Sequence, residues 1–204
     1  SLGSVSNAQD RIVQSDFWFT NLNYLKFGKK WSIGNEVHIR RTDFLKKWEQ
    51  FLVRPWLTYK PNDHFSVSTG YSYIRTYPYA PYMKQTHVQE HNVWEQITLF
   101  HQSKKVKFSH RIRLEQRFRE NQVEQSDLSF ERDGFLFSQR FRYRLTIKVP
   151  FAKRFFFMAF NEIWIKTNGN FTQPKYDRNW LYLGFGVKPF KNASLGFAAI
   201  NIFD

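Results

Sequence analysis

The strongest constraint on the fold is a strict alternation of apolar and charged side chains between residues 106 and 119. One set is mainly apolar and comprises Val106, Phe108, His110, Ile112, Leu114, Gln116 and Phe118. The other set is polar and mostly basic and comprises Lys107, Ser109, Arg111, Arg113, Glu115, Arg117 and Arg119. Only an extended strand, whose successive side chains point to opposite faces, separates these sets. The segment is therefore predicted to be a β-strand with two unlike faces.

The same period of two recurs along the chain, and no segment shows a convincing helical period. Residues 135–149 place apolar side chains opposite a basic set made of Arg140, Arg142, Arg144 and Lys148. Further alternating segments begin near residues 17, 31, 51, 65, 93, 154, 181 and 193. Segments of roughly ten residues match tilted strands that cross a bilayer better than the shorter strands of soluble sheets.

The predicted connections alternate in length along the chain. Short polar turns are expected at residues 28–30, 61–63, 103–105, 152–153 and 188–189, and longer links near 42–47, 76–87, 120–133 and 167–177. Short turns on one rim and long loops on the other are typical of outer-membrane barrels. The predicted fold class is all-β, an antiparallel up-and-down transmembrane β-barrel of about 10–12 strands.

Alternation alone does not say which face meets lipid, because a soluble lipocalin-like barrel has apolar side chains inside. The chain is 20% aromatic, and no run of apolar residues is long enough for a membrane helix. The apolar faces of about ten strands would overfill a small barrel interior. Aromatic residues also stand near predicted strand ends, where membrane girdles lie, namely Trp18, Trp31, Trp48, Tyr59, Tyr71, Tyr73 and Trp180. We therefore expect lipid outside and arginine inside.

The N-terminal segment suggests a secreted protein. Ser6-Asn7-Ala8 has the small residues of a cleavage site before Gln9, so residues 1–9 are interpreted as the tail of a secretory signal or a flexible N-terminus. Residues 10–204 form one expected barrel domain, and the alternation stops where a closing strand would follow. The absence of cysteine suits passage through an oxidising periplasm.

The formal net charge of +14 indicates an anionic partner or a cation-rich interior. The candidate interior network comprises Glu36, Arg40, Glu90, Arg111, Arg113, Glu115, Arg117, Arg140, Arg142, Arg144 and Glu162. Crowded guanidinium groups need counter-charges, so one interpretation is a satisfied network that plugs and rigidifies the barrel. The other is the lining of a pore that attracts anions. Basic side chains at the surface would contact the phosphates of lipopolysaccharide.

Other chemistries receive little support from the sequence. His87 and His91 would lie roughly 13 Å apart on a strand, so we expect no metal site and no cofactor. Ser109 and His110 point to opposite faces, although pairs such as Ser66 or Ser72 with His38 keep a lipid-modifying enzyme open as an alternative. We expect no nucleic-acid binding, because the aromatic side chains are predicted on the face opposite the arginines.

Several stretches together resemble one known family. They are residues 111–118 (RIRLEQRF), 140–145 (RFRYRL), Asn161-Glu162 and 177–186 (DRNWLYLGFG). The chain resembles the DUF2490 outer-membrane proteins, which are common in Bacteroidetes. This resemblance implies an outer-membrane barrel without an agreed activity and supplies no catalytic residues. Two departures are Trp180, where the family tends to have arginine, and the missing terminal strand.

We therefore expect a bacterial outer-membrane barrel with a narrow interior rich in arginine and glutamate. Its partners would be outer-membrane lipid, lipopolysaccharide and other outer-membrane proteins. It would act either as a pore for small solutes or anions, or as a non-conducting accessory subunit of a larger complex.

Overall fold

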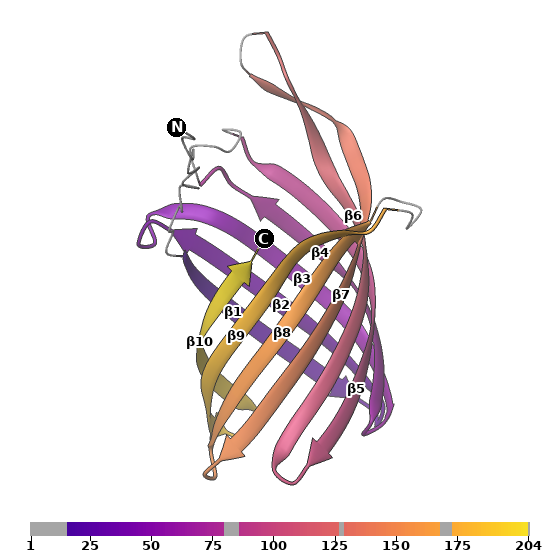
Figure 1. The fold of residues 1–204 in the computed structure, drawn as a ribbon, viewed down its shortest axis with the longest axis vertical. Helices are drawn as coiled ribbons and strands as arrows, with labels where there is room; N and C mark the ends of the chain where they lie inside the picture. Colours follow the sequence, from indigo (N-terminus) through magenta and orange to yellow (C-terminus); the bar gives the residue numbers. More distant parts are fainter. Residues whose placement is uncertain (1–15, 80–85, 127–128, 168–172, 204) are drawn as a thin grey trace, which may run out of the picture.

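The computed structural model describes residues 16–79, 86–126, 129–167 and 173–203, and these form ten strands and no helix (Figure 1). The strands are β1 (Asp16–Phe27), β2 (Trp31–Thr42), β3 (Lys47–Asn62), β4 (Phe65–Thr76), β5 (Val88–Ser103), β6 (Val106–Glu124), β7 (Phe130–Phe151), β8 (Phe155–Thr167), β9 (Lys175–Phe190) and β10 (Ala193–Phe203). Each strand pairs antiparallel with its neighbours in sequence. The described residues hold no helix able to cross a membrane.

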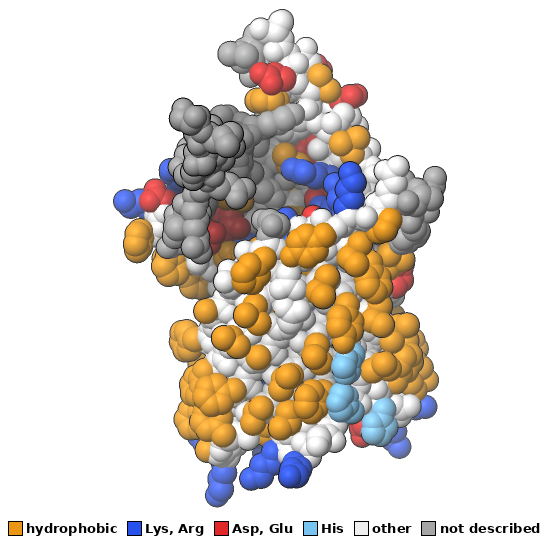
Figure 2. Space-filling view, in the orientation of Figure 1, with side chains coloured by type: hydrophobic (Ala, Val, Ile, Leu, Met, Phe, Trp, Pro, Cys, Tyr) orange, Lys and Arg blue, Asp and Glu red, His pale blue; other side chains and the backbone are white. Residues whose placement is uncertain are grey.

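The sheet curls into a half-barrel with a convex and a concave face, which confirms the predicted all-β meander (Figure 1). Large apolar side chains cover the convex face (Figure 2). Ile112 and Leu183 on that face are 38% and 59% exposed, whereas Arg113 and Arg142 on the concave face are 5% and 3% exposed. The space enclosed by the concave face is called the interior below.

The two ends of the half-barrel differ in the length of their connections. The five links from each odd-numbered strand to the next contain two or three residues, and they define the short-turn end. The two edge strands, β1 and β10, form no backbone pairing with each other within the described residues. Side chains reach across the opening instead, because the rings of Trp18 and Trp180 lie 5.5 Å apart.

The prediction that Trp18 and Trp180 lie in an outer aromatic girdle is wrong. Cross-strand partners share a face of the sheet, and Trp18 is paired with Arg40 while Trp180 is paired with Glu162. Trp94 and Trp164 also face the interior, opposite Glu115 and Arg142 respectively. The expectation that the aromatic side chains avoid the arginine face therefore fails for these four tryptophans.

The predicted long link at 120–133 is also wrong, because most of it is strand. β6 continues to Glu124, β7 begins at Phe130, and Gln125 closes the connection by donating its backbone N–H to Ser129 at 2.9 Å. This hairpin rises beyond the other strands (Figure 1). Most residues at the start of β7 are exposed, so water meets both faces there and the alternation that marks the other strands is lost.

Candidate functional site

The centre of the interior is built around Glu115, whose side chain is 1% exposed. Its two carboxylate oxygens accept hydrogen bonds from Arg140 Nη2 at 2.5 Å and from Arg142 Nη1 at 2.6 Å. Arg113 Nη1 lies 3.6 Å from the same carboxylate. Three guanidinium groups therefore surround one fully desolvated acid.

A second buried acid, Glu162, extends this arrangement and is 0% exposed. It accepts hydrogen bonds from Arg142 Nε at 2.9 Å and Arg144 Nη2 at 2.6 Å, and it also pairs with Arg111. Arg142 thus bridges both carboxylates. The central network contains five arginines and two glutamates, which leaves an excess of three positive charges. Arg140 also lies 3.7 Å from Asp177, but Asp177 pairs with Arg178 as well, so this further pair leaves the excess unchanged.

Strand register explains why these residues meet. Glu115 on β6 stands directly opposite Arg140 on β7, and Arg144 on β7 stands opposite Glu162 on β8. Direct opposition brings side chains on one face within reach of each other. The central network is therefore produced by the pairing of three consecutive strands.

Interior tryptophans pack against the guanidinium groups of the central network. The Arg113 guanidinium lies 4.0 Å from the ring centre of Trp94, and that of Arg142 lies 3.8 Å from the ring centre of Trp164. The indole N–H of Trp94 donates to the hydroxyl of Ser72 at 3.1 Å. Cation–π contacts of desolvated guanidinium groups hold the arginines in place beside the carboxylates.

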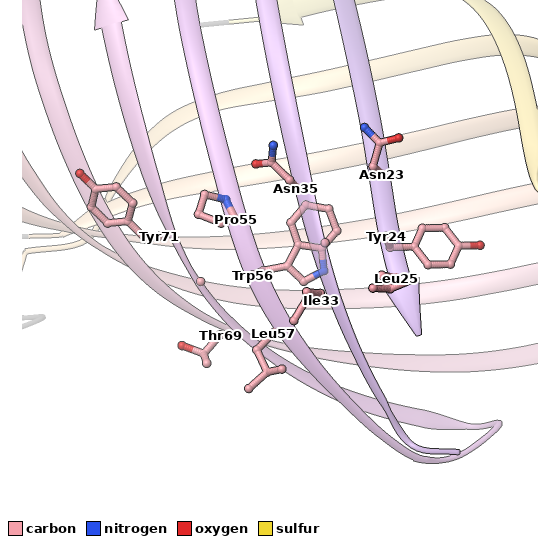
Figure 3. Close-up of a pocket in the computed structure, with 12 residues that line it drawn as sticks. Asn23, Tyr24, Leu25, Ile33, Asn35, Pro55, Trp56, Leu57, Thr69 and Tyr71 are labelled. Carbon is pink, nitrogen blue, oxygen red and sulfur yellow. The ribbon is translucent and has the colours of Figure 1, made fainter. Parts of the chain in front are cut away.

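Two glycines make room for the interior indoles. A Cβ at Gly34 would lie 2.1 Å from the ring of Trp56, and one at Gly70 would lie 2.4 Å from the ring of Trp94. Trp56 extends from β3 across β2 at the position of Gly34 (Figure 3). Any side chain at these positions would displace an indole and reshape the interior.

The other predicted network residues form separate pairs. Glu90 and Arg117 share two hydrogen bonds of 2.7 and 2.8 Å. Glu36 accepts one hydrogen bond from Arg54 at 2.7 Å and lies 2.6 Å from the ring of His38. These pairs are internally balanced, so the positive excess lies in the central network.

Arg40 pairs with Glu49, an acid that the sequence analysis missed. The Arg40–Glu49 distance is 3.9 Å, and the Arg40 guanidinium lies 3.8 Å from the ring centre of Trp18. Glu49 reaches the interior because the sheet has a register shift there, with Gln50 opposite Arg40 and Trp48 opposite Arg41. A bulge of this kind breaks the alternation, so no period-two pattern could reveal it. Arg54, by contrast, follows the regular alternation of the segment that begins near residue 51, opposite its apolar side chains, and could have been predicted.

A chamber of about 410 Å³ lies between the central network and the short-turn end. Its charged lining consists of four arginines and one glutamate: Arg54, Arg111, Arg113, Arg144 and Glu36. Ser and Thr hydroxyls and the amide of Gln96 complete the polar wall. With four arginines and one glutamate in its lining, the chamber has a net positive wall.

A larger hollow of about 860 Å³ lies against β1 to β4 (Figure 3). Its lining is mostly apolar, with the polar groups of Asn23, Asn35, Thr69, Tyr24 and Tyr71, and includes no charged side chain. It therefore offers no chemistry for recognising an ion. The smaller arginine chamber is the candidate site.

The side chains weighed for catalysis have other partners. His110 lies on the convex face with its ring 2.8 Å from the Tyr143 hydroxyl, away from Ser109. The Ser72 hydroxyl accepts hydrogen bonds from Arg54 and Trp94, while the His38 ring contacts Glu36. No group of three or more potential metal ligands occurs in the part of the chain that the structure describes.

The comparison with family models identifies the chain. Residues 15–204 match the model described as "Protein of unknown function (DUF2490)". The chain belongs to the DUF2490 family. A solved structure, the translocator domain of the autotransporter NalP from Neisseria meningitidis, is similar at 11% sequence identity with a TM-score of 0.47, covering 90% of this chain and 74% of that one. No curated protein matches.

The stretches that carried the DUF2490 resemblance are those that build the central network. Residues 111–118 and 140–145 supply its β6 and β7 side chains, and Glu162 supplies its second acid. Trp180, the departure from the DUF2490 pattern, packs on Trp164 with ring centres 4.5 Å apart. Residues 1–9, interpreted as a signal tail, lie outside the described residues.

Proposed function

We propose that this DUF2490 protein resides in the outer membrane of a Gram-negative bacterium, with lipid and lipopolysaccharide against its convex face. The support is the apolar convex face of a meander whose concave face holds buried charge. Fractionation of cells that produce the protein should place it in the outer membrane, with heat-modifiable mobility in gels. Recovery as monodisperse protein in plain buffer would contradict this localisation. Origin in Bacteroidetes stays a prediction.

We further propose that the interior admits small anions from the short-turn end. The observation that carries this proposal is the excess of three positive charges in a central network that forms one wall of the 410 Å³ chamber. Fixed guanidinium groups in a confined space raise the local concentration of anions and repel cations. The guanidinium groups of Arg111, Arg113 and Arg144 line the chamber and would replace part of the hydration shell of an anion there.

A second candidate function is a non-conducting accessory role in an outer-membrane complex. The observation that favours it is the packing at the centre, where Trp94, Glu115 and Glu162 are 1%, 1% and 0% exposed. An ion that passes this level must displace buried side chains. We therefore expect a small conductance if the anion pathway continues through the centre.

Planar-bilayer recording under a potassium chloride gradient separates these candidates. We expect a reversal potential that shows chloride selectivity, which Arg111→Gln and Arg144→Gln should weaken. Lys46→Gln is the control, because this substitution removes one positive charge from the β2–β3 connection, where Lys46 is exposed and lies outside the chamber. Folded protein without current would favour the accessory role, and cation selectivity would contradict the anion pathway.

We propose no catalytic function. The support is the engagement of Ser72 and His38 with other groups and the separation of Ser109 from His110. Mass spectrometry of lipid A from cells with and without the protein tests the enzymatic alternative. A modified lipid that depends on the protein would contradict this proposal.

A further inference from the structure

Three lysines converge at the short-turn end of the interior, apart from the arginine chamber. Lys107 on β6 and Lys148 on β7 are direct cross-strand partners, on the same face as Arg111 and Arg144. Lys188 on β9 joins them, and the charges of Lys107 and Lys188 both act on Lys148. Figure 2 shows basic side chains gathered along this end of the molecule.

This arrangement is unfavourable for an isolated sheet, because like charges directly opposite each other on two strands repel. Two other lysines near turns have an acid beside them: Lys60 lies 3.1 Å from Asp63, and Lys47 lies 3.7 Å from Asp43. Among the described residues, no carboxylate forms an ion pair with the three converging lysines. Their combined charge therefore lacks a counter-ion within this part of the protein.

The three lysines line a small cavity, in which Lys148 is partly buried while Lys107 and Lys188 are exposed to solvent. Its volume is about 70 Å³, and its other walls come from Pro150, Phe155, Phe156 and the β7–β8 turn, Ala152 to Arg154. Lys148 Nζ lies 3.7 Å from the ring centre of Phe156. The Phe156 ring is 8% exposed and fixed against Gly186, where a Cβ would lie only 2.2 Å away. One ammonium group is thus held by a packed aromatic ring.

The size and charge of this cavity select a class of ligand. A water molecule occupies about 30 Å³ in the liquid, so the cavity has room for one tetrahedral oxyanion but not for a whole sugar or nucleobase. Lysine binds phosphate as a point charge, and a phosphoryl group carries nearly two negative charges at neutral pH. Lys153 and Arg154 in the adjoining turn add further cations to the wall.

We propose that Lys107, Lys148 and Lys188 form a phosphoryl-binding site at the short-turn mouth of the interior. The biological role of this site rests on the proposed anion pathway, because the site would collect phosphoryl anions at the short-turn entrance of that pathway. The cross-strand pairs Ser109–Thr146 and Arg111–Arg144 follow along the same strands and lead to the chamber. The ligand is inorganic phosphate or a phosphate carried by a soluble molecule or a lipid headgroup.

Isothermal titration of the folded, detergent-solubilised protein with inorganic phosphate tests the site. We expect saturable binding, and Lys148→Gln should raise the dissociation constant about tenfold or more, because it removes a charged donor. Lys148→Arg keeps the charge and should retain most binding, which separates loss of the site from misfolding. Lys29→Gln removes a lysine from the β1–β2 turn, outside the cavity, and should leave binding unchanged.

Nanodiscs distinguish the sources of the phosphoryl group. If phosphatidic acid in the nanodisc weakens the binding of inorganic phosphate and phosphatidylcholine does not, the site binds a lipid phosphate. If the affinity for inorganic phosphate is the same in both lipids, the site binds a soluble phosphate. Absence of saturable phosphate binding, or equal binding by wild type and by the Lys107→Gln, Lys148→Gln and Lys188→Gln variants, overturns the site. A chloride-selective current without phosphate binding contradicts the phosphoryl site and leaves the anion pathway standing. Phosphate binding without current contradicts the anion pathway and leaves the phosphoryl site standing.

Discussion

At the scale of single residues, Arg142 is the connection on which the interior depends. It bridges Glu115 and Glu162 and stacks on Trp164, while its own side chain is almost inaccessible to water. A buried ion pair adds little net stability, because desolvation offsets its attraction. Removing one partner is different, since the remaining charges stay buried without compensation.

Glu162→Gln should therefore destabilise the protein by about 3–5 kcal/mol, because Arg111, Arg142 and Arg144 would share no acid at that position. Urea unfolding in detergent micelles, followed by tryptophan fluorescence, measures the change. Asp63→Asn is the control. Lys60 donates to Asp63 and lowers the pKa of that carboxyl, but the pair is exposed, so the unfolding midpoint should not move. An unchanged midpoint for Glu162→Gln would contradict the network.

At the scale of strands, close packing between indoles and glycines shapes the concave wall from β2 to β5. Trp56 lies over Gly34, and Trp94 lies over Gly70, so each indole packs directly on the backbone of the neighbouring strand. The indoles in turn leave the arginines only limited positions, because Arg113 stacks on Trp94. Strand packing therefore sets the geometry of the charges.

Gly34→Ala and Gly70→Ala should each cost about 1–3 kcal/mol, since the added methyl group overlaps an indole ring. Gly196→Ala is the matched control on β10, where the nearest atom to an added Cβ is 3.4 Å away and little change is expected. The measurement is the unfolding free energy, with the tryptophan emission maximum reporting any displacement of the indoles. Equal stability of all three variants would show that the close contacts are absent.

At the scale of the whole molecule, the distribution of apolar and charged side chains is the reverse of that in a soluble domain. Charged side chains are buried on the concave face, and large apolar side chains are exposed on the convex face (Figure 2). A contiguous apolar belt of this extent in water would promote aggregation, whereas lipid chains cover it without cost.

Ile112→Lys tests this inversion, because Ile112 lies on the convex face near the middle of the span of β6 that pairs with β5. In a bilayer we expect a loss of about 2–4 kcal/mol, whereas exposed substitutions in water usually change stability by less than about 0.5 kcal/mol. Phe44→Lys in the β2–β3 connection, where Phe44 is 76% exposed, should have little effect. Unfolding measured in lipid vesicles distinguishes the variants, and equal stabilities would argue against a lipid-facing belt.

Alternation along the sequence determined the strand class, the order of the strands and the face that carries Arg111, Arg113, Arg140, Arg142 and Arg144, because side-chain direction in a strand is a local property. It did not determine which acid meets which arginine. Those partners depend on register between strands, and Glu49 enters the interior only through a bulge. The inward tryptophans, the length of the β6–β7 hairpin and the lysine cavity likewise followed from the tertiary structure, since curvature and cross-strand packing join residues that no local pattern connects.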